Sequence, residues 1–200
     1  MSVGERVQEC INKIEMNDAI NAFIQLAIAI DGTAKKEYPG KKTSFRCKSF
    51  LRENLPFVMW SLTNGTPTNC KNFKFEFSNN DYPKGMTNFE DIIYNVLRCS
   101  LLHEGEMPDK VTFINESYIA MKDGKMLFPM ALIISLLFAV IASPTNKNQR
   151  VSNNTHFIFG EIKAYVNDMW GSEEKTKNYI RNGFQYDVEK LLENHIKSKK

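Results

Sequence analysis

The sequence predicts a mainly α-helical protein that carries a small antiparallel β-sheet, and three observations predict it. Most of the chain falls into runs whose apolar side chains recur every three or four positions, the period of an amphipathic helix. Residues 73–77 instead alternate between phenylalanine and charged side chains, which is the period of a strand. Residues 111–128 predict paired strands that turn at Asp123-Gly124, a dipeptide typical of tight hairpins. The length of 200 residues suits one domain, and we expect it to span residues 1–200.

The first part of the chain predicts three helices with short breaks between them. A short amphipathic helix covers residues 5–14, and Asn17 or Asp18 caps the next one. A third helix begins at Thr43 or Ser44. It is expected to end before Pro56, because proline lacks the backbone N–H that the interior of a helix needs.

A fourth helix is expected over about residues 88–104. Thr87 and Glu90 have the spacing of a capping box, which places the start near Asn88. Gly105 is expected to end the helix, and a proline three residues later prevents it from resuming.

The longest apolar run, over residues 126–142, predicts a fully buried helix from about 127 to 142. A membrane span is the less favoured alternative, because the run is shorter than the roughly 20 residues that a bilayer needs. The remaining C-terminal helices are expected within about 157–197, as two segments at 157–170 and 184–196.

Composition excludes several classes of protein. The formal charge of +3 is mildly basic, so it permits an anionic partner without requiring one. The four cysteines are scattered, without a Cys-x-x-Cys pair, and indicate neither a disulfide framework nor a zinc site. The first residues are charged and amphipathic, unlike a signal peptide. We therefore expect a cytoplasmic protein that uses no metal or other cofactor.

Arg98 and His103 are the candidate catalytic pair. His103 falls in the last turn of the predicted helix, where the negative end of the helix dipole favours a protonated imidazole. Such a side chain can give or take a proton near neutral pH, and a neighbouring arginine can bind phosphate oxygens. These groups suit cleavage of RNA by attack of its own 2′-hydroxyl, with the arginine stabilising the developing charge.

Both residues also have simpler explanations. A histidine near the end of a helix complements the helix dipole, and an arginine on a helix usually faces solvent. Arg150 and His156 have a similar spacing within a polar loop, so spacing alone is weak evidence. Positions five apart do not share a helix face. Either the Arg98 side chain bends toward the imidazole, or the same helix of a second subunit supplies the facing pair.

The stretch "YNVLRCSLLHEGEM", followed by a short hairpin and a long apolar helix, resembles the HEPN superfamily (higher eukaryotes and prokaryotes nucleotide-binding domains). The signature of that superfamily is an arginine, usually a polar residue, and a histidine after four to six positions on a late helix. Arg98 and His103 match it at the shortest spacing, and Cys99 stands where the polar residue is usual. The earlier stretch "AIAIDGTAKKEYP" is similar to helices that precede the motif in bacterial members. The resemblance covers residues 17–142 loosely and 92–107 specifically.

The resemblance implies a HEPN-like helical bundle that dimerises so that two Arg-His motifs line one cleft. Many members are metal-independent endoribonucleases of toxin–antitoxin, abortive-infection or other defence systems, and others bind nucleotides or proteins without catalysis. For this chain it implies an RNA substrate, a homodimer without a membrane association, and an antitoxin or regulatory protein as a further partner. The alternative function is a non-catalytic HEPN-like module that binds a nucleotide or a protein.

Several other residues are candidates for supporting roles. Asp31 interrupts an apolar helix and either orients the catalytic pair or marks the point where that helix leaves the core. Asn95, one turn before the arginine, and Cys99 are expected to face the same cleft. The basic segment over residues 35–52 either holds the RNA backbone, through Lys41, Lys42 and Arg46, or forms a solvated helix face. The phenylalanines of 73–77 fit a strand with one buried face better than a platform for stacking bases.

Overall fold

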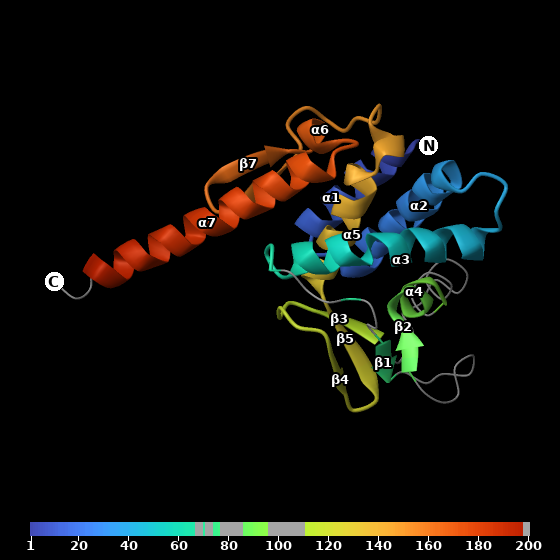
Figure 1. Cartoon of the computed structure of the whole chain (residues 1–200), viewed down its shortest axis with the longest axis horizontal. Coiled ribbons are helices and arrows are strands. Elements are labelled where there is room, and N and C mark those ends of the chain that lie inside the picture. Colours follow the sequence, from blue (N-terminus) through green and yellow to red (C-terminus); the bar gives the residue numbers. More distant parts are fainter. Residues whose placement is uncertain (67–69, 71–73, 77–85, 96–110, 198–200) are drawn as a thin grey trace.

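The protein is mainly α-helical, with small β-sheets beside the helices, as the sequence predicts (Figure 1). The structure is a computed structural model. It describes residues 1–66, 70, 74–76, 86–95 and 111–197.

The helices pack in two groups around a central helix, α5. Helix α1 packs on α2, and α2 and α3 pack on each other and on α5 (Figure 1). On another side α5 contacts α6 and α7. The bounds are α1 Val3–Glu15, α2 Ala19–Glu37, α3 Thr43–Leu62, α5 Met130–Ala142, α6 Val166–Met169 and α7 Glu173–Lys197.

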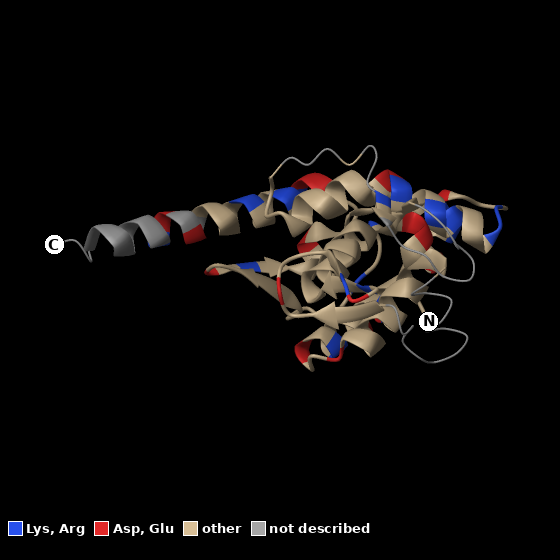
Figure 2. Cartoon of the chain, turned by 90° about the horizontal axis from the view of Figure 1, so that it is seen from below, with Lys and Arg blue, Asp and Glu red and all other residues tan. Residues whose placement is uncertain are grey.

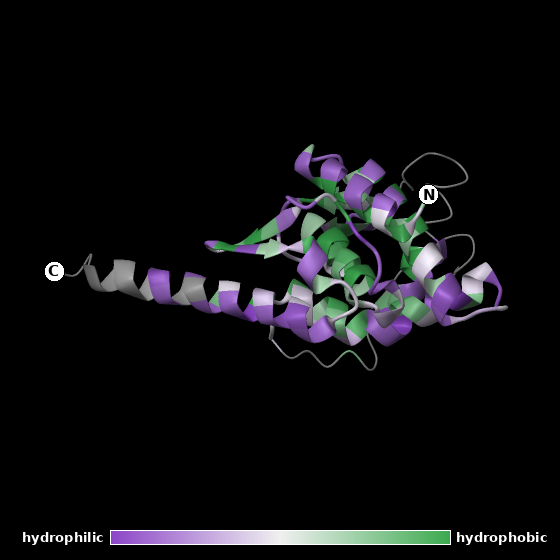
Figure 3. Cartoon of the chain, turned by 90° about the horizontal axis from the view of Figure 1, so that it is seen from above, coloured by the Kyte–Doolittle hydropathy of each residue, from purple (hydrophilic) through white to green (hydrophobic). Residues whose placement is uncertain are grey.

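Helix α5 forms the centre of the hydrophobic core. Every residue from Leu136 to Ala142 is buried, so the helix has no solvent-facing side over this stretch (Figure 3). The predicted buried helix is therefore confirmed. It starts three residues later than expected, because residues 125–129 form a strand and Pro129 takes the N-cap position with φ −67°. Among the described residues, no helix has both the length and the hydropathy of a membrane span.

Short polar side chains fix the starts of the first two helices. The Ser2 hydroxyl accepts a hydrogen bond from the Glu5 N–H at 3.1 Å, and the Glu5 carboxylate accepts one from the Ser2 N–H, so the two form a capping box. The Asp18 carboxylate accepts from the Asn21 N–H at 3.1 Å, which confirms the predicted cap of α2.

The prediction that α3 ends before Pro56 is wrong, because α3 continues to Leu62. Pro56 cannot donate to the carbonyl of Arg52. Both residues are on the exposed side of the helix, where water can satisfy that carbonyl. The cost is offset on the opposite side of the helix, where the residues on either side of Pro56 are buried in the core: Leu55, Phe57, Val58 and Met59.

Two small sheets lie below the helices (Figure 1). In the larger one, β4 and β5 form the predicted hairpin, and Asp123 and Gly124 both have the positive φ of a tight primed turn, at 50° and 74°. Strand β3 pairs with β5 in parallel, so this sheet is mixed and the predicted antiparallel hairpin forms two of its three strands. The most buried strand, β5, thereby takes the central position. The strands are β1 Lys74–Glu76 paired with β2 Met86–Asn88, then β3 Val111–Ile114, β4 Ala120–Lys122 and β5 Lys125–Pro129.

After α5 the chain turns through the 3-10 helix η2 (Pro144–Asn146), which is tied to α2. The Asn146 side chain is fully buried and donates to the Thr33 hydroxyl at 2.9 Å and to the Val140 carbonyl at 2.8 Å. Its oxygen accepts from Lys36 Nζ at 3.0 Å. One side chain thus links three segments of the chain.

The predicted helix over 157–170 is wrong. This segment forms an antiparallel hairpin, β6 His156–Phe159 and β7 Ile162–Tyr165, followed by the short helix α6. Phe157 and Phe159 point the same way from β6 and place their rings 4.8 Å and 5.8 Å from the ring of Phe138. The two phenylalanines are two residues apart, which is the spacing of side chains on one face of a strand, and the predicted helix did not take this spacing into account.

Helix α7 begins at Glu173, eleven residues before the start expected from the sequence. Its first half packs beside β6 and β7, and the rest extends away from the helices (Figure 1). Gly183 lies at the point of closest approach, because a Cβ atom there would stand 2.2 Å from the Phe159 Cβ. Only glycine lets this helix lie so close to the hairpin.

Candidate functional site

Helix α4 (Phe89–Asp91) is the described start of the helix on which the sequence places the catalytic pair. The chain continues as a π-helical turn over residues 92–95. The predicted start near residue 88 is confirmed, but Asn88 takes the N-cap position while Thr87 belongs to β2. Arg98, Cys99 and His103 lie outside the described residues, as does the rest of the predicted 88–104 helix.

Two ion pairs fasten this first turn to α3. Asp91 Oδ1 lies 2.8 Å from Lys48 Nζ, and Glu90 Oε1 accepts a hydrogen bond from Arg52 Nε at 2.7 Å. The Lys48 ammonium also lies 5.4 Å from the centroid of the Tyr94 ring, one turn further along. Because both carboxylates stand at the positive end of the helix, its dipole stabilises them as well. Residues 89–95 are the described start of the helix that the sequence predicts for Arg98 and His103, called the motif helix below. The two ion pairs therefore hold this start in a fixed position on α3.

The Arg52–Glu90 pair is asymmetric in its exposure. The Glu90 side chain is 6% exposed and that of Arg52 is 61% exposed. The hydrogen bond to Glu90 raises the pKa of the Arg52 guanidinium, so the arginine stays charged. Since Glu90 is buried, loss of this partner costs more than the loss of one partner of a surface ion pair would.

Replacing Arg52 with methionine is expected to lower the free energy of unfolding by roughly 1–3 kcal/mol, because the buried Glu90 carboxylate loses its charged donor. The double variant Arg52→Met/Glu90→Gln should recover part of that loss, since no buried charge is left unpaired. Urea unfolding followed by circular dichroism measures both. Equal losses in the single and double variants would contradict the account of this pair.

A second charged cluster surrounds Asp31 on α2. Asp31 Oδ1 accepts hydrogen bonds from Arg46 Nε at 2.9 Å, from Arg46 Nη2 at 2.7 Å and from the Cys47 thiol at 3.4 Å. The prediction that Asp31 marks where α2 leaves the core is wrong, because α2 continues to Glu37 with Thr33 and Ala34 buried. Within the part of the chain that the structure describes, the role of Asp31 is to hold α3 through Arg46.

Buried apolar side chains lie between the ion pairs of Glu90 and Asp91 and the charged cluster around Asp31. Ile93 and Tyr94 of the motif helix are buried against α2 and α3. They line one small apolar cavity together with Phe23, Ala27, Ile30, Cys47 and Leu51. The motif helix is thus held by a packed apolar contact as well as by charge.

The remaining predicted residues fall into two groups. Lys41 and Lys42 are exposed at the start of α3. Arg46 forms an ion pair with Asp31, so its guanidinium is not free to bind a phosphate as predicted. Asn95 is half-buried at the end of the described part of the motif helix.

The four side chains of the two ion pairs were not singled out from the sequence as parts of the site. The sequence held one signal for them. Lys48 and Arg52 are four residues apart and therefore share a helix face, and two cations so placed can pair with two adjacent acidic residues such as Glu90 and Asp91.

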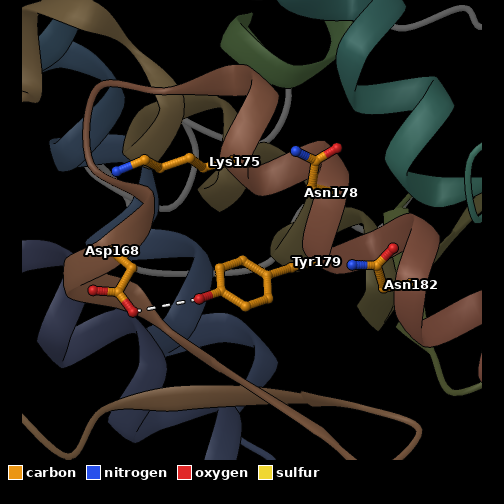
Figure 4. Close-up of a pocket in the computed structure, with 5 residues that line it drawn as sticks. All are labelled: Asp168, Lys175, Asn178, Tyr179 and Asn182. Carbon is orange, nitrogen blue, oxygen red and sulfur yellow. Dashed lines mark hydrogen bonds between the residues drawn. The ribbon is translucent and has the colours of Figure 1, made fainter.

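A separate polar cavity of about 370 Å³ lies on α7 beside α6 (Figure 4). The Tyr179 hydroxyl donates to Asp168 Oδ2 at 3.3 Å, and Asn178 and Asn182 stand on the other side of that ring. Burial, followed by the nearby Asp168 charge, raises the pKa of Tyr179. The lining is mostly exposed and its polar groups do not converge on one point, so this cavity is the weaker candidate for a site.

Across the described ranges, no three His, Cys, Asp or Glu side chains gather as ligands of a metal ion would.

Comparison with known proteins gives a family for this chain. It is similar to the uncharacterized proteins Mb1320 of Mycobacterium bovis and Rv1289 of Mycobacterium tuberculosis, each 21% identical over 187 residues. Each alignment covers 90% of this chain and 88% of the relative. No solved structure matches the chain. The Rv1289 family model matches residues 2–194, and the chain therefore belongs to the Rv1289 family.

Proposed function

We propose that this protein is a metal-independent endoribonuclease of HEPN type that acts through Arg98 and His103 at a cleft between two copies of the chain. The observation that carries the proposal is the Arg-x4-His spacing in the sequence, within the helix predicted over about residues 88–104, whose described start is α4. The anchored start of that helix supports it, because a catalytic side chain needs a rigid base.

In this proposal the imidazole of His103 transfers a proton to or from the reacting oxygens, and the Arg98 guanidinium binds the phosphate whose charge increases. Lys48 and Arg52 are positioning residues. They do not touch RNA in this scheme, but they fix the helix that carries the pair through Asp91 and Glu90.

The cellular role that fits this chemistry is that of a toxin or a phage-defence effector in the cytoplasm, with an antitoxin or regulatory protein as its inhibitor. A ribonuclease that needs no metal ion requires such control, since cytoplasmic RNA is always within reach.

Product analysis in excess chelator tests the proposal. The wild-type protein, incubated with a mixed RNA pool, is expected to leave 2′,3′-cyclic phosphate ends, because the attacking group is the neighbouring 2′-hydroxyl. Cleavage that stops in chelator, or that leaves only 5′-phosphate and 3′-hydroxyl ends, would contradict it. A wild-type protein that binds RNA or nucleotides without cutting would favour the non-catalytic HEPN-like module.

A further inference from the structure

The connection between α2 and α3 carries an exposed aromatic side chain surrounded by lysines. Phe45, on the first turn of α3, is 53% exposed. The Tyr38 ring meets it edge-on, with centroids 6.3 Å apart and an interplanar angle of 85°. Tyr38 is itself packed against the hydrophobic core, so it supports the Phe45 ring while about half of the Phe45 surface stays exposed to solvent.

A tight turn brings a lysine to the same ring. Residues Tyr38 to Lys41 form a β-turn in which the Lys41 N–H donates to the Tyr38 carbonyl at 3.3 Å and Gly40 has φ +77°. Lys41 Nζ then lies 5.7 Å from the centroid of Phe45. The turn thus fixes a cation and an aromatic ring side by side.

Basic residues, in blue, gather at the end of the molecule where α2 joins α3 (Figure 2). Residues 35–48 hold six basic side chains and one acidic one, Glu37: the basic ones are Lys35, Lys36, Lys41, Lys42, Arg46 and Lys48. Arg46 and Lys48 are engaged by aspartates, and Lys36 by Asn146. In the described part of the chain, Lys35, Lys41 and Lys42 are exposed and have no carboxylate partner.

We propose that Phe45 is a stacking platform for an unpaired base of single-stranded RNA, with Lys41 and Lys42 binding the flanking phosphates. An exposed aromatic side chain beside cations is the combination that single-stranded nucleic acid recognises, since every base has a face to stack and every linkage carries a charge. The bases of a duplex are already stacked on one another, so a duplex cannot use the ring.

The platform lies at the same end of α3 as the motif helix. Lys48, one turn after Phe45, contacts both Asp91 and Tyr94 of that helix. A strand bound at Phe45 would therefore run beside the start of the helix that carries the catalytic pair. As a site for substrate, this inference rests on the proposed function.

The test is a binding measurement in which no cleavage occurs. Full-length protein carrying His103→Ala is titrated into a fluorescently labelled single-stranded oligoribonucleotide and, separately, into a duplex of the same sequence, with anisotropy as the signal. Adding Phe45→Ala is expected to weaken single-strand binding about tenfold and duplex binding little. Phe45→Trp should retain the affinity, and Phe184→Ala, which removes an aromatic ring of similar exposure on α7, should change neither.

Phe45→Leu keeps an apolar side chain in the same place without a flat ring, so it answers the question if the alanine variant is unstable. Single-strand affinity that is the same in Phe45→Ala and Phe45→Leu as in the parent would overturn the platform. So would binding of poly-glutamate as tightly as RNA, because that result would indicate a general polyanion surface. Cleavage by the wild type with no effect of Phe45 would reject the platform alone. Phe45-dependent binding without any cleavage would reject the endoribonuclease and keep the platform.

Discussion

Replacing Phe138 with alanine is expected to lower the free energy of unfolding by about 3–5 kcal/mol, which is the cost of removing a fully buried phenylalanine. Phe138 is 2% exposed, and its ring meets those of Phe157 and Phe159. The substitution removes the ring against which Phe157 and Phe159 of the β6–β7 hairpin pack, and it leaves a cavity at that place. The surrounding side chains cannot fill all of this cavity, so the full cost of the lost contacts is expected.

Denaturant unfolding of the variant beside wild type measures this loss. Ile158→Ala is the matched control, because Ile158 belongs to the same hairpin but is 66% exposed, and its loss should be within about 0.5 kcal/mol. Similar losses from both substitutions would mean that the hairpin does not pack on α5 as described.

His103→Ala is expected to reduce the rate of RNA cleavage about 10²–10⁴-fold, the usual contribution of a general acid or base. Arg98→Ala should reduce it as well, and Arg98→Lys should restore only part of the rate, since an ammonium cannot bind two phosphate oxygens as a guanidinium does. The thermal unfolding of each variant is the control for folding. A cleavage rate unchanged by either alanine substitution would place the chemistry elsewhere on the chain.

The sequence predicted those elements whose signals are local. The Asp18 cap, the start of α4 and the Asp123-Gly124 turn each depend on a few neighbouring residues, and each is found where the sequence placed it. The buried helix α5 was recognised because almost every residue of it is apolar.

The errors arose where distant contacts outweigh local preference. Pro56 stays within α3 because the buried side chains on either side of it compensate for one missing hydrogen bond. The hairpin over 156–165 is stabilised by Phe138, which lies some twenty residues earlier in the chain. Neither the core contacts around Pro56 nor the contact between Phe138 and the hairpin can be predicted from the neighbouring residues in the sequence.

The candidate site was predictable only in part. Arg98 and His103 came from a motif, and they stay predictions because they lie outside the described residues. The anchoring of residues 89–95 to α3, by contrast, came from pairs of residues about 40 positions apart, Lys48 with Asp91 and Arg52 with Glu90. Such pairs can be found only once the fold is known.

The most direct test of the central claim is the cleavage rate of one defined single-stranded oligoribonucleotide in excess chelator, measured for wild type and His103→Ala in parallel. The account predicts cleavage by the wild type at a rate that added Mg²⁺ does not raise, and none above background by the variant. Cleavage by the variant at the wild-type rate would contradict the account.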